Sequence, residues 1–339
     1  MKKLKVIQVG ILHEHSGAIM NSLRMMEDVF EVMGYVDETD FVKSVYFPVN
    51  TVEPYKGIKR FSFDEALHHP DVEAFLVEVT NNDLADVTLQ LLERKLPVHW
   101  DKPGGEEPDT FKKVIDVCRR NDIPLHMGYM FRSNPAMMLC RELAASGVLG
   151  DILEVSMDMN HDYGNEEYMR YLKSFTGGVM YNLGCHIFDF VALLLGRPDN
   201  VVPFLKNIPG TGNGVYNNTM AVLEYPHTLV TATVSCGRVD GMKQRRLLVS
   251  GTKGTFEVYP VESLFGHEFF AELWLKEDAG KYHAGVNRIP FGTPHRYREH
   301  LLEFAKIARR EIENPVSFEH ELLVHEITLA AAGKIKWSK

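Results

Sequence analysis

The sequence predicts an α/β fold in two parts, a doubly wound parallel sheet followed by an α+β domain with a large mixed or antiparallel open sheet. The chain has 339 residues, and at about 150 residues per domain this length suggests two domains. Up to about residue 129, short apolar runs alternate with helical patterns, as in a parallel sheet covered on both faces. Beyond it, several strand-like runs follow one another, as in an antiparallel or mixed sheet. We therefore expect domains at residues 1–126 and 127–339.

The strands of the first domain are expected in compact apolar runs, each bounded by turn residues. Between them, apolar side chains recur at helical spacing. The clearest case is Phe111, Val114, Ile115 and Cys118, whose i, i+3, i+4, i+7 spacing predicts an amphipathic helix. The predicted strands are residues 4–9, 32–37, 74–79, 98–101 and 124–129.

Capping and turn residues indicate the elements of the second domain. Asn134 before Pro135 is a typical helix start, and Gly196 is a typical helix end. The predicted elements are a helix after Asn134, a strand at 152–159, a helix at 184–195, a hairpin turning at 225–228, two strands parted by 251–254, and a helical tail at 296–335 that breaks near Asn314.

Composition excludes several classes of protein. Hydrophobic residues make up 45% of the chain, enough for a full core and too many for a disordered chain. The net charge of −9 disfavours binding to a nucleic-acid backbone. Four scattered cysteines without a CxxC pair indicate neither a disulfide framework nor a zinc knuckle. The first residues are too polar for a signal peptide, and no apolar run has the ~18 residues that span a bilayer. We expect a cytoplasmic protein.

The first strand is followed by a glycine turn and a helix, the arrangement that binds dinucleotide phosphates. Of the GxGxxG pattern, only Gly10 is present, and Leu12 and His15 stand at the other glycine positions. Asp37 ends the second strand, where an acid would accept the ribose hydroxyls. An ordinary strand-to-helix turn explains these residues equally well. The candidate cofactor contacts here are Gly10, Ile11, Leu12, His13, His15 and Asp37.

His13 and His15 invite two further interpretations. One is that either ring donates an N–H to a phosphate, in place of the missing glycines. The other is half of a metal site, but no third ligand stands at a characteristic spacing. We therefore predict no metal here.

Two later groups of residues suggest catalysis. Lys102 follows Asp101 and precedes Pro103 at the carboxyl end of a predicted parallel strand, the edge where ligands bind in open α/β sheets. Asn182, His186 and Asp189 fall at i, i+4, i+7 and would share one side of a helix. Histidine is the usual general acid or base near neutral pH. A solvated loop lysine and a hydrogen-bonded histidine at a helix start are the alternatives.

Taken in order, the motifs resemble those of the Gfo/Idh/MocA oxidoreductase family over nearly the whole chain. Asp101-Lys102-Pro103 resembles the Glu-Lys-Pro motif. Residues 128–135 are similar to Gly-Tyr-x-x-Arg-x-x-Pro, and residues 177–189 resemble Gly-Gly-Gly-x-x-x-Asp-x-Gly-x-His-x-x-Asp. The segments at 251–255 and 315–319 also stand in family-like places.

The resemblance implies a Rossmann domain that binds NAD, with NADP possible, and a C-terminal sheet that pairs subunits into a homodimer or homotetramer. It implies hydride transfer to or from a sugar, polyol or related small molecule. Lys102 would bind the reacting hydroxyl and His186 would take its proton, beside Asn182. Further candidate cofactor contacts are Thr80, Asn81, Asp101 and Lys102. Candidate substrate contacts are Tyr129, Arg132, Tyr163, Lys173, Asn182 and His186.

Three residues depart from the family pattern. The phosphate turn has Leu12 in place of a glycine, Asn182 replaces an aspartate, and Leu84 replaces a histidine after the fourth strand. Asp37 favours NAD, because a carboxylate repels the 2′-phosphate of NADP. The alternative functions are a non-catalytic nucleotide- or sugar-sensing regulator and an NAD-assisted glycosidase or lyase.

Overall fold

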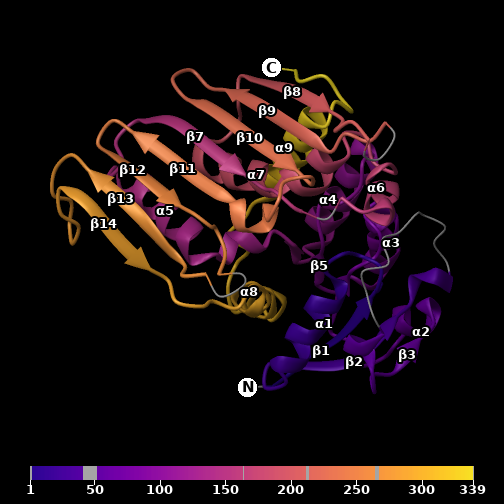
Figure 1. Cartoon of the computed structure of the whole chain (residues 1–339). Coiled ribbons are helices and arrows are strands. Elements are labelled where there is room, and N and C mark those ends of the chain that lie inside the picture. Colours follow the sequence, from indigo (N-terminus) through magenta and orange to yellow (C-terminus); the bar gives the residue numbers. More distant parts are fainter. Residues whose placement is uncertain (1, 41–51, 163, 211–213, 264–266, 339) are drawn as a thin grey trace. The chain divides into compact units, whose positions relative to one another are not determined.

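The computed structural model divides the chain into two compact units (Figure 1). It describes all residues except 1, 41–51, 163, 211–213, 264–266 and 339. The first unit combines Met1–Tyr129 with Tyr297–His325, and the second combines Met130–Arg296 with Glu326–Lys339. The predicted boundary after residue 126 lies close to the first division. The tail differs from the prediction, because residues 297–325 belong to the first unit.

The first unit contains a six-stranded sheet in which every neighbouring pair is parallel. Its order is β3-β2-β1-β4-β5-β6, so the chain reverses its direction of travel between β1 and β4. In such sheets, ligands bind beside the carboxyl ends of the strands at this reversal. The predicted doubly wound sheet is confirmed. The strands are β1 (Leu4–Val9), β2 (Phe30–Val36), β3 (Arg60–Phe61), β4 (Ala74–Val77), β5 (Val98–Trp100) and β6 (Leu125–Met127).

Helices cover this sheet, and one of them comes from the tail of the chain. The four residues of the predicted stripe on α4 are all buried. On α8, the rings of His300 and Phe304 lie against those of His99 and His126 on β5 and β6. These contacts place α8 in the first unit. The helices are α1 (Ser16–Met25), α2 (Phe63–Leu67), α3 (Leu84–Leu91), α4 (Pro108–Asn121) and α8 (Arg298–Ala308), and α9 (Phe318–Ala331) contains the last division between the units.

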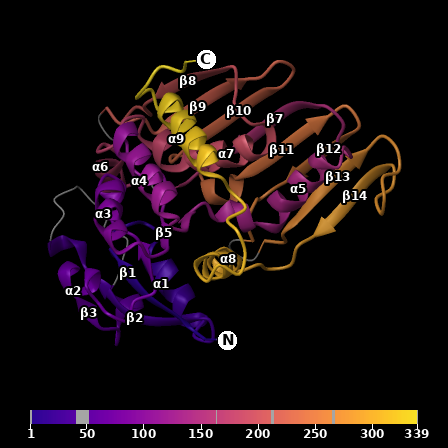
Figure 2. The same cartoon turned by 180° about the vertical axis from the view of Figure 1, so that it is seen from behind.

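The second unit contains an eight-stranded sheet of order β14-β13-β12-β11-β7-β10-β9-β8 (Figure 2). Strand β7 pairs in parallel with β10 and antiparallel with β11, so the sheet is mixed, as predicted. The predicted hairpin joins β9 to β10. The strands are β7 (Ile152–Asp158), β8 (Asn200–Lys206), β9 (Asn218–Glu224), β10 (Leu229–Ser235), β11 (Arg246–Gly251), β12 (Gly254–Val258), β13 (Phe270–Leu275) and β14 (Gly285–Pro290).

Three helices, α5 (Pro135–Ala145), α6 (Glu166–Leu172) and α7 (Val179–Leu195), belong entirely to this unit. The Asn134 side chain accepts hydrogen bonds from the first amides of α5, as predicted. Helix α7 packs on β10 and starts five residues before the predicted residue 184. Its N-cap is Gly178, at φ +54°, where a Cβ would overlap the carbonyl of Tyr216. The chain can therefore enter the helix directly after this glycine.

The described residues contain no helix that is long and apolar enough to cross a membrane. All four cysteines are described, all are buried, and no disulfide links them. The absence of a disulfide framework agrees with the scattered spacing of the cysteines in the sequence.

Candidate functional site

The turn after β1 requires its glycine. Gly10 has φ +105°, a conformation that side chains other than glycine rarely adopt. A Cβ at this position would overlap the backbone of Glu78 and Val79, directly after β4. Helix α1 then begins at Ser16. The backbone therefore has the strand–turn–helix form expected of a phosphate turn.

Glu38, rather than Asp37, contacts this turn. Its carboxylate accepts hydrogen bonds from the amides of Ile11, at 2.6 Å, and Leu12, at 2.9 Å. Burial raises the pKa of Glu38 to about 7, so this carboxyl group gains or loses its proton near neutral pH. Sequence reasoning missed Glu38, although it is the second of two adjacent acids that follow β2.

Asp37 faces the sheet edge strand β3. Its carboxylate accepts from the amide and hydroxyl of Thr39 and lies 3.3 Å from Nη2 of Arg60. An arginine in this region can accommodate a 2′-phosphate. The pairing therefore offsets the preference for NAD that Asp37 alone suggested.

His13 and His15 both point to Asp101, which follows β5. Their Nδ1 atoms lie 3.0 and 3.1 Å from Oδ2 of Asp101, and Nε2 of His13 donates to the carbonyl of Lys102 at 3.1 Å. Burial lowers the pKa of His15 to about 4. Burial would raise the pKa of Asp101, but His13 and His15 hold it well below its usual value. In this structure both rings therefore contact the buried carboxylate of Asp101.

These contacts supply the third ligand that the sequence did not show. Ligand atoms of His13, His15 and Asp101 all lie within 4.8 Å of one another. The set could accept a metal ion, although its members also bond to one another. Asp101 lies 86 residues from His15, so no local pattern in the sequence predicts the group.

Lys102 forms an ion pair inside the same cluster. Its Nζ lies 3.2 Å from Oε1 of Glu14, and both side chains are buried. Burial would raise the pKa of Glu14, but the charge of Lys102 brings it below its usual value. Glu78 behaves in the opposite way, since burial and the adjacent Asp101 raise its pKa well above the usual value. The edge thus combines an ion pair with a carboxyl group whose pKa is raised.

The remaining predicted residues of the first unit follow other strands at their carboxyl ends. Thr80 and Asn81 come after β4, and both are buried. The Thr80 hydroxyl donates to Asp83. Tyr129 is buried shortly after β6. The structure therefore brings the predicted cofactor contacts to one edge of the parallel sheet.

In the second unit, Asn182, His186 and Asp189 lie on α7, as predicted, and all three are buried. Asn182 donates from Nδ2 to the Tyr168 hydroxyl at 3.2 Å. The His186 ring lies 5.3 Å from that of Phe131, measured between centroids. The helix therefore places the predicted base beside a polar amide and an aromatic ring.

Arg132 is bound to Asp189. Its Nε lies 3.1 Å from both carboxylate oxygens of Asp189, and its Nη2 lies 2.6 Å from Oδ1. Such a bidentate ion pair fixes the orientation of both side chains. Of the other predicted substrate contacts, Lys173 is exposed after α6, and Tyr163 lies outside the described residues.

Comparisons with known proteins agree with this architecture. The family model of the GFO/IDH/MocA C-terminal domain matches residues 137–257. The chain is 25% identical over 142 residues to the rhizopine catabolism protein MocA of Rhizobium meliloti, covering 42% of this chain and 44% of the relative. It is 25% identical over 175 residues to a dTDP-3,4-didehydro-2,6-dideoxy-alpha-D-glucose 3-reductase of Streptomyces violaceoruber, covering 52% and 51%. The chain thus spans about half the length of the curated relatives it matches.

Solved structures share the fold over nearly the entire chain. A putative NADPH-dependent oxidoreductase from Desulfitobacterium hafniense has a TM-score of 0.80 at 16% identity, covering 99% of this chain and 96% of its own. A levoglucosan dehydrogenase in complex with NADH and levoglucosan has a TM-score of 0.79 at 15% identity, covering 98% of each. The predicted resemblance to the Gfo/Idh/MocA family is confirmed by the family model and the named relatives.

Proposed function

Because the chain resembles the Gfo/Idh/MocA family in its motifs and its fold, we propose that it is a nicotinamide-dependent oxidoreductase. Its substrate would be a sugar, polyol or related small molecule with a reacting hydroxyl carbon. The observation that carries this proposal is the carboxyl edge of the six-stranded sheet, where the Gly10 turn lies beside Lys102 and several titratable groups. The sugar-nucleotide reductase and the NADH-bound dehydrogenase among the similar proteins support the same class.

The residues at this edge fit a dinucleotide. Gly10 lets the turn pack closely against the residues after β4, and α1 begins shortly after the turn, so the N-terminus of α1 favours negative charge there. Glu38 is the acid that would accept the ribose hydroxyls, because its carboxylate already contacts the turn. NAD and NADP are both candidates, since Arg60 stands beside Asp37. When bound, the nicotinamide ring supplies the hydride acceptor or donor.

The protein's own residues would orient the substrate and move its proton. Lys102 is a buried cation. Its Nζ would leave the carboxylate of Glu14 and bind the reacting oxygen of the substrate. His186 would accept the hydroxyl proton at a ring nitrogen, with Asn182 orienting the substrate through its amide. A positioned base of this kind contributes roughly 10²–10⁴-fold to the rate.

The test is a panel of sugars and inositols with NAD and NADP, in which nicotinamide absorbance is followed. We expect turnover by the wild type and at least a ~100-fold loss in Lys102→Ala. Lys112→Ala removes an exposed lysine from α4 and is the matched control. Full turnover in Lys102→Ala would overturn the proposed mechanism.

A non-catalytic sensor is the second candidate. Two contacts within the chain favour it. Glu38 accepts hydrogen bonds from the turn amides, and Glu14 forms an ion pair with Lys102. A sensor would bind a nucleotide or sugar in the same panel without any hydride transfer. Binding with turnover would exclude it.

We also propose that the chain forms a homo-oligomer, a homodimer or homotetramer, through the eight-stranded sheet. Residues on its strands alternate between buried and partly exposed. The partly exposed face carries apolar side chains, among them Phe204, Val222 and Leu229. Light scattering of the wild type should give a multiple of 38.6 kDa, and Phe204→Glu should lower it. A monomeric wild type would contradict this.

A further inference from the structure

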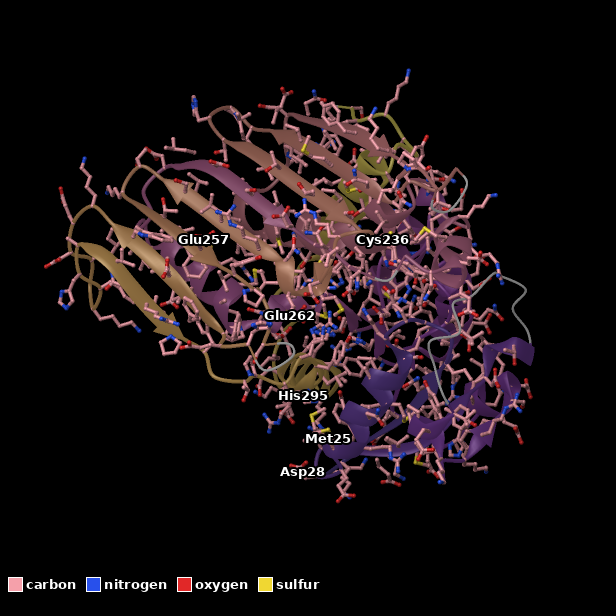
Figure 3. All side chains as sticks on the ribbon, in the orientation of Figure 1. Met25, Asp28, Cys236, Glu257, Glu262 and His295 are labelled. Atoms are coloured by element: carbon pink, nitrogen blue, oxygen red, sulfur yellow. The ribbon has the colours of Figure 1, made fainter. Side chains whose placement is uncertain are left out.

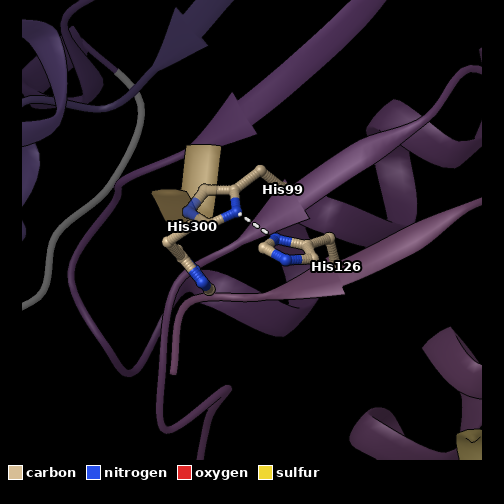
Figure 4. A group of neighbouring side chains, drawn as sticks. All are labelled: His99, His126 and His300. Carbon is tan, nitrogen blue, oxygen red and sulfur yellow. Dashed lines mark hydrogen bonds between the residues drawn. The ribbon is translucent and has the colours of Figure 1, made fainter. Parts of the chain in front are cut away.

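Three buried imidazoles converge beneath α8, on one face of the six-stranded sheet (Figure 4). His99 and His126 are register neighbours on β5 and β6, and His300 faces them from the first turn of α8. Their exposed fractions are 0, 1 and 1%. Strands of a parallel sheet covered on both faces normally carry apolar side chains at such positions, and burying polar groups costs free energy unless they are bound. Hydrophobic packing alone does not account for three histidines here.

The ring nitrogens stand close to the spacing of metal ligands. Nδ1 of His99 lies 3.0 Å from Nδ1 of His126, and one ligand nitrogen from each of the three rings lies within 4.8 Å of the others. Zinc binds imidazole nitrogen at about 2.0–2.1 Å, so two such ligands in a tetrahedral site lie about 3.3 Å apart. The strand histidines already meet this spacing, and a small shift of the His300 ring would complete the set.

Carboxylates face the opposite nitrogens of the strand histidines. Oε1 of Glu303 lies 3.3 Å from Nε2 of His126, and Oε1 of Glu78 lies 4.0 Å from Nε2 of His99. A histidine that binds a metal through one nitrogen usually donates its other N–H to a carboxylate, which fixes the ring. The Glu303 carboxylate would also offset the charge of the ion. The arrangement therefore includes one outer partner of a metal site, Glu303, as well as its ligands.

We propose that His99, His126 and His300 form a binding site for a divalent transition metal ion. Imidazole ligands suit zinc, copper, iron and nickel, and zinc is the ion for which three histidines and a water form a familiar tetrahedral set. The ion would replace the hydrogen bond between the two Nδ1 atoms. It would join β5 and β6 to α8 within the first unit. This site does not depend on the proposed oxidoreductase function, since none of its ligands belongs to the proposed machinery.

The test is metal binding to the purified full-length chain after treatment with a chelator. We expect one Zn²⁺ per chain, measured by competition with a chromophoric chelator, and one Co²⁺ with the visible absorption of a tetrahedral nitrogen-rich site. The melting temperature should rise with added Zn²⁺, because a ligand that binds only the folded state stabilises it. A wild type that binds neither ion would overturn the site.

Substitutions of the proposed ligands and of Glu303 test where the ion binds. His126→Gln and His300→Gln should each abolish stoichiometric binding, and Glu303→Gln should weaken it by roughly 10–100-fold. His325→Gln is the matched control, because His325 is also buried in the first unit but its Nε2 contacts the carbonyl of Gly105. If a glutamine variant does not fold, His126→Phe replaces it in the test, because phenylalanine keeps a ring beneath α8 and cannot bind a metal ion.

Two outcomes with these variants would also overturn the site. One is stoichiometric binding that persists in folded His126→Phe or His300→Gln. The other is binding that disappears in His13→Gln but survives in His300→Gln, which would place the ion at His13, His15 and Asp101. Activity is not needed for any of these readouts, so failure here leaves the proposed function untouched.

Discussion

The two units bury their charges in different ways. At the carboxyl edge of the six-stranded sheet, Asp101 is shared by His13 and His15, and the nearby Glu38 holds two backbone amides. In the second unit, Arg132 and Asp189 form a closed two-pronged pair. The acids of the first region have pKa values shifted in both directions.

We propose that the acids of the first region exchange partners with a ligand, whereas the Arg132–Asp189 pair stabilises the second unit. A carboxylate with several partners can give one of them up to a ligand, whereas a closed buried pair leaves an uncompensated charge when it is broken. Glu262 of the second unit, labelled in Figure 3, is likewise compensated by guanidinium groups, since it forms ion pairs with Arg245 and Arg296. We therefore propose that the nicotinamide cofactor binds at the first region, and we treat Arg132 and Asp189 as structural.

The largest expected effect comes from opening the closed pair. Asp189→Asn should lower the free energy of unfolding by about 3–5 kcal/mol, because Arg132 stays buried without its carboxylate. Urea denaturation measures this loss. Asp240→Asn is the control, since it opens an ion pair with Lys243 that is largely exposed and should cost no more than about 1 kcal/mol. Similar losses in the two variants would contradict the contrast between the regions.

A smaller, pH-dependent effect is expected at Glu38. Its pKa is raised from 4.5 to about 7 in the folded state, so the folded protein holds this proton more tightly than the unfolded chain. The wild type therefore loses stability as pH rises between these values. Glu38→Gln has no such proton, so its stability relative to the wild type should rise by roughly 3 kcal/mol across this range.

Urea denaturation on either side of this range measures the difference. Glu27→Gln, which changes an exposed glutamate of the same unit, is the control. A Glu38→Gln profile parallel to that of the wild type would show that burial does not raise the pKa of Glu38 in the folded state.

The smallest effect concerns the cap of α5 in the second unit. Asn134 accepts from the amides of Ala136 and Met137 at 3.0 and 3.2 Å. Asn134→Ala should cost about 1 kcal/mol, because it removes this acceptor, and chemical denaturation measures the loss. Equal stability of the alanine variant and the wild type would mean that this cap does not stabilise the unit.

Local features of the fold could be predicted from the sequence, because apolar runs and turn residues act on their neighbours. The strand at residues 4–9, the cap at Asn134 and the hairpin at 225–228 are examples. The start of α7 was predicted too late, since it depends on a contact between Gly178 and Tyr216. The tail was assigned to the wrong unit, because the packing of α8 depends on distant rings.

The candidate site was predictable only in part, for the same reason. Gly10 and Lys102 stand at strand ends that the apolar pattern reveals. The bonds from Glu38 to the turn and from His15 to Asp101 join residues 27 and 86 positions apart. The order of the strands determines which distant residues become neighbours, and no single segment of the sequence specifies that order.

The central claim is that a nicotinamide dinucleotide binds at the Gly10 turn. Hydrogen–deuterium exchange with and without NADH or NADPH tests it most directly, followed in peptides that span residues 10–16. We expect at least one of the nucleotides to slow exchange there, while peptides from β14 stay unchanged. Exchange at residues 10–16 that neither nucleotide alters would contradict the claim.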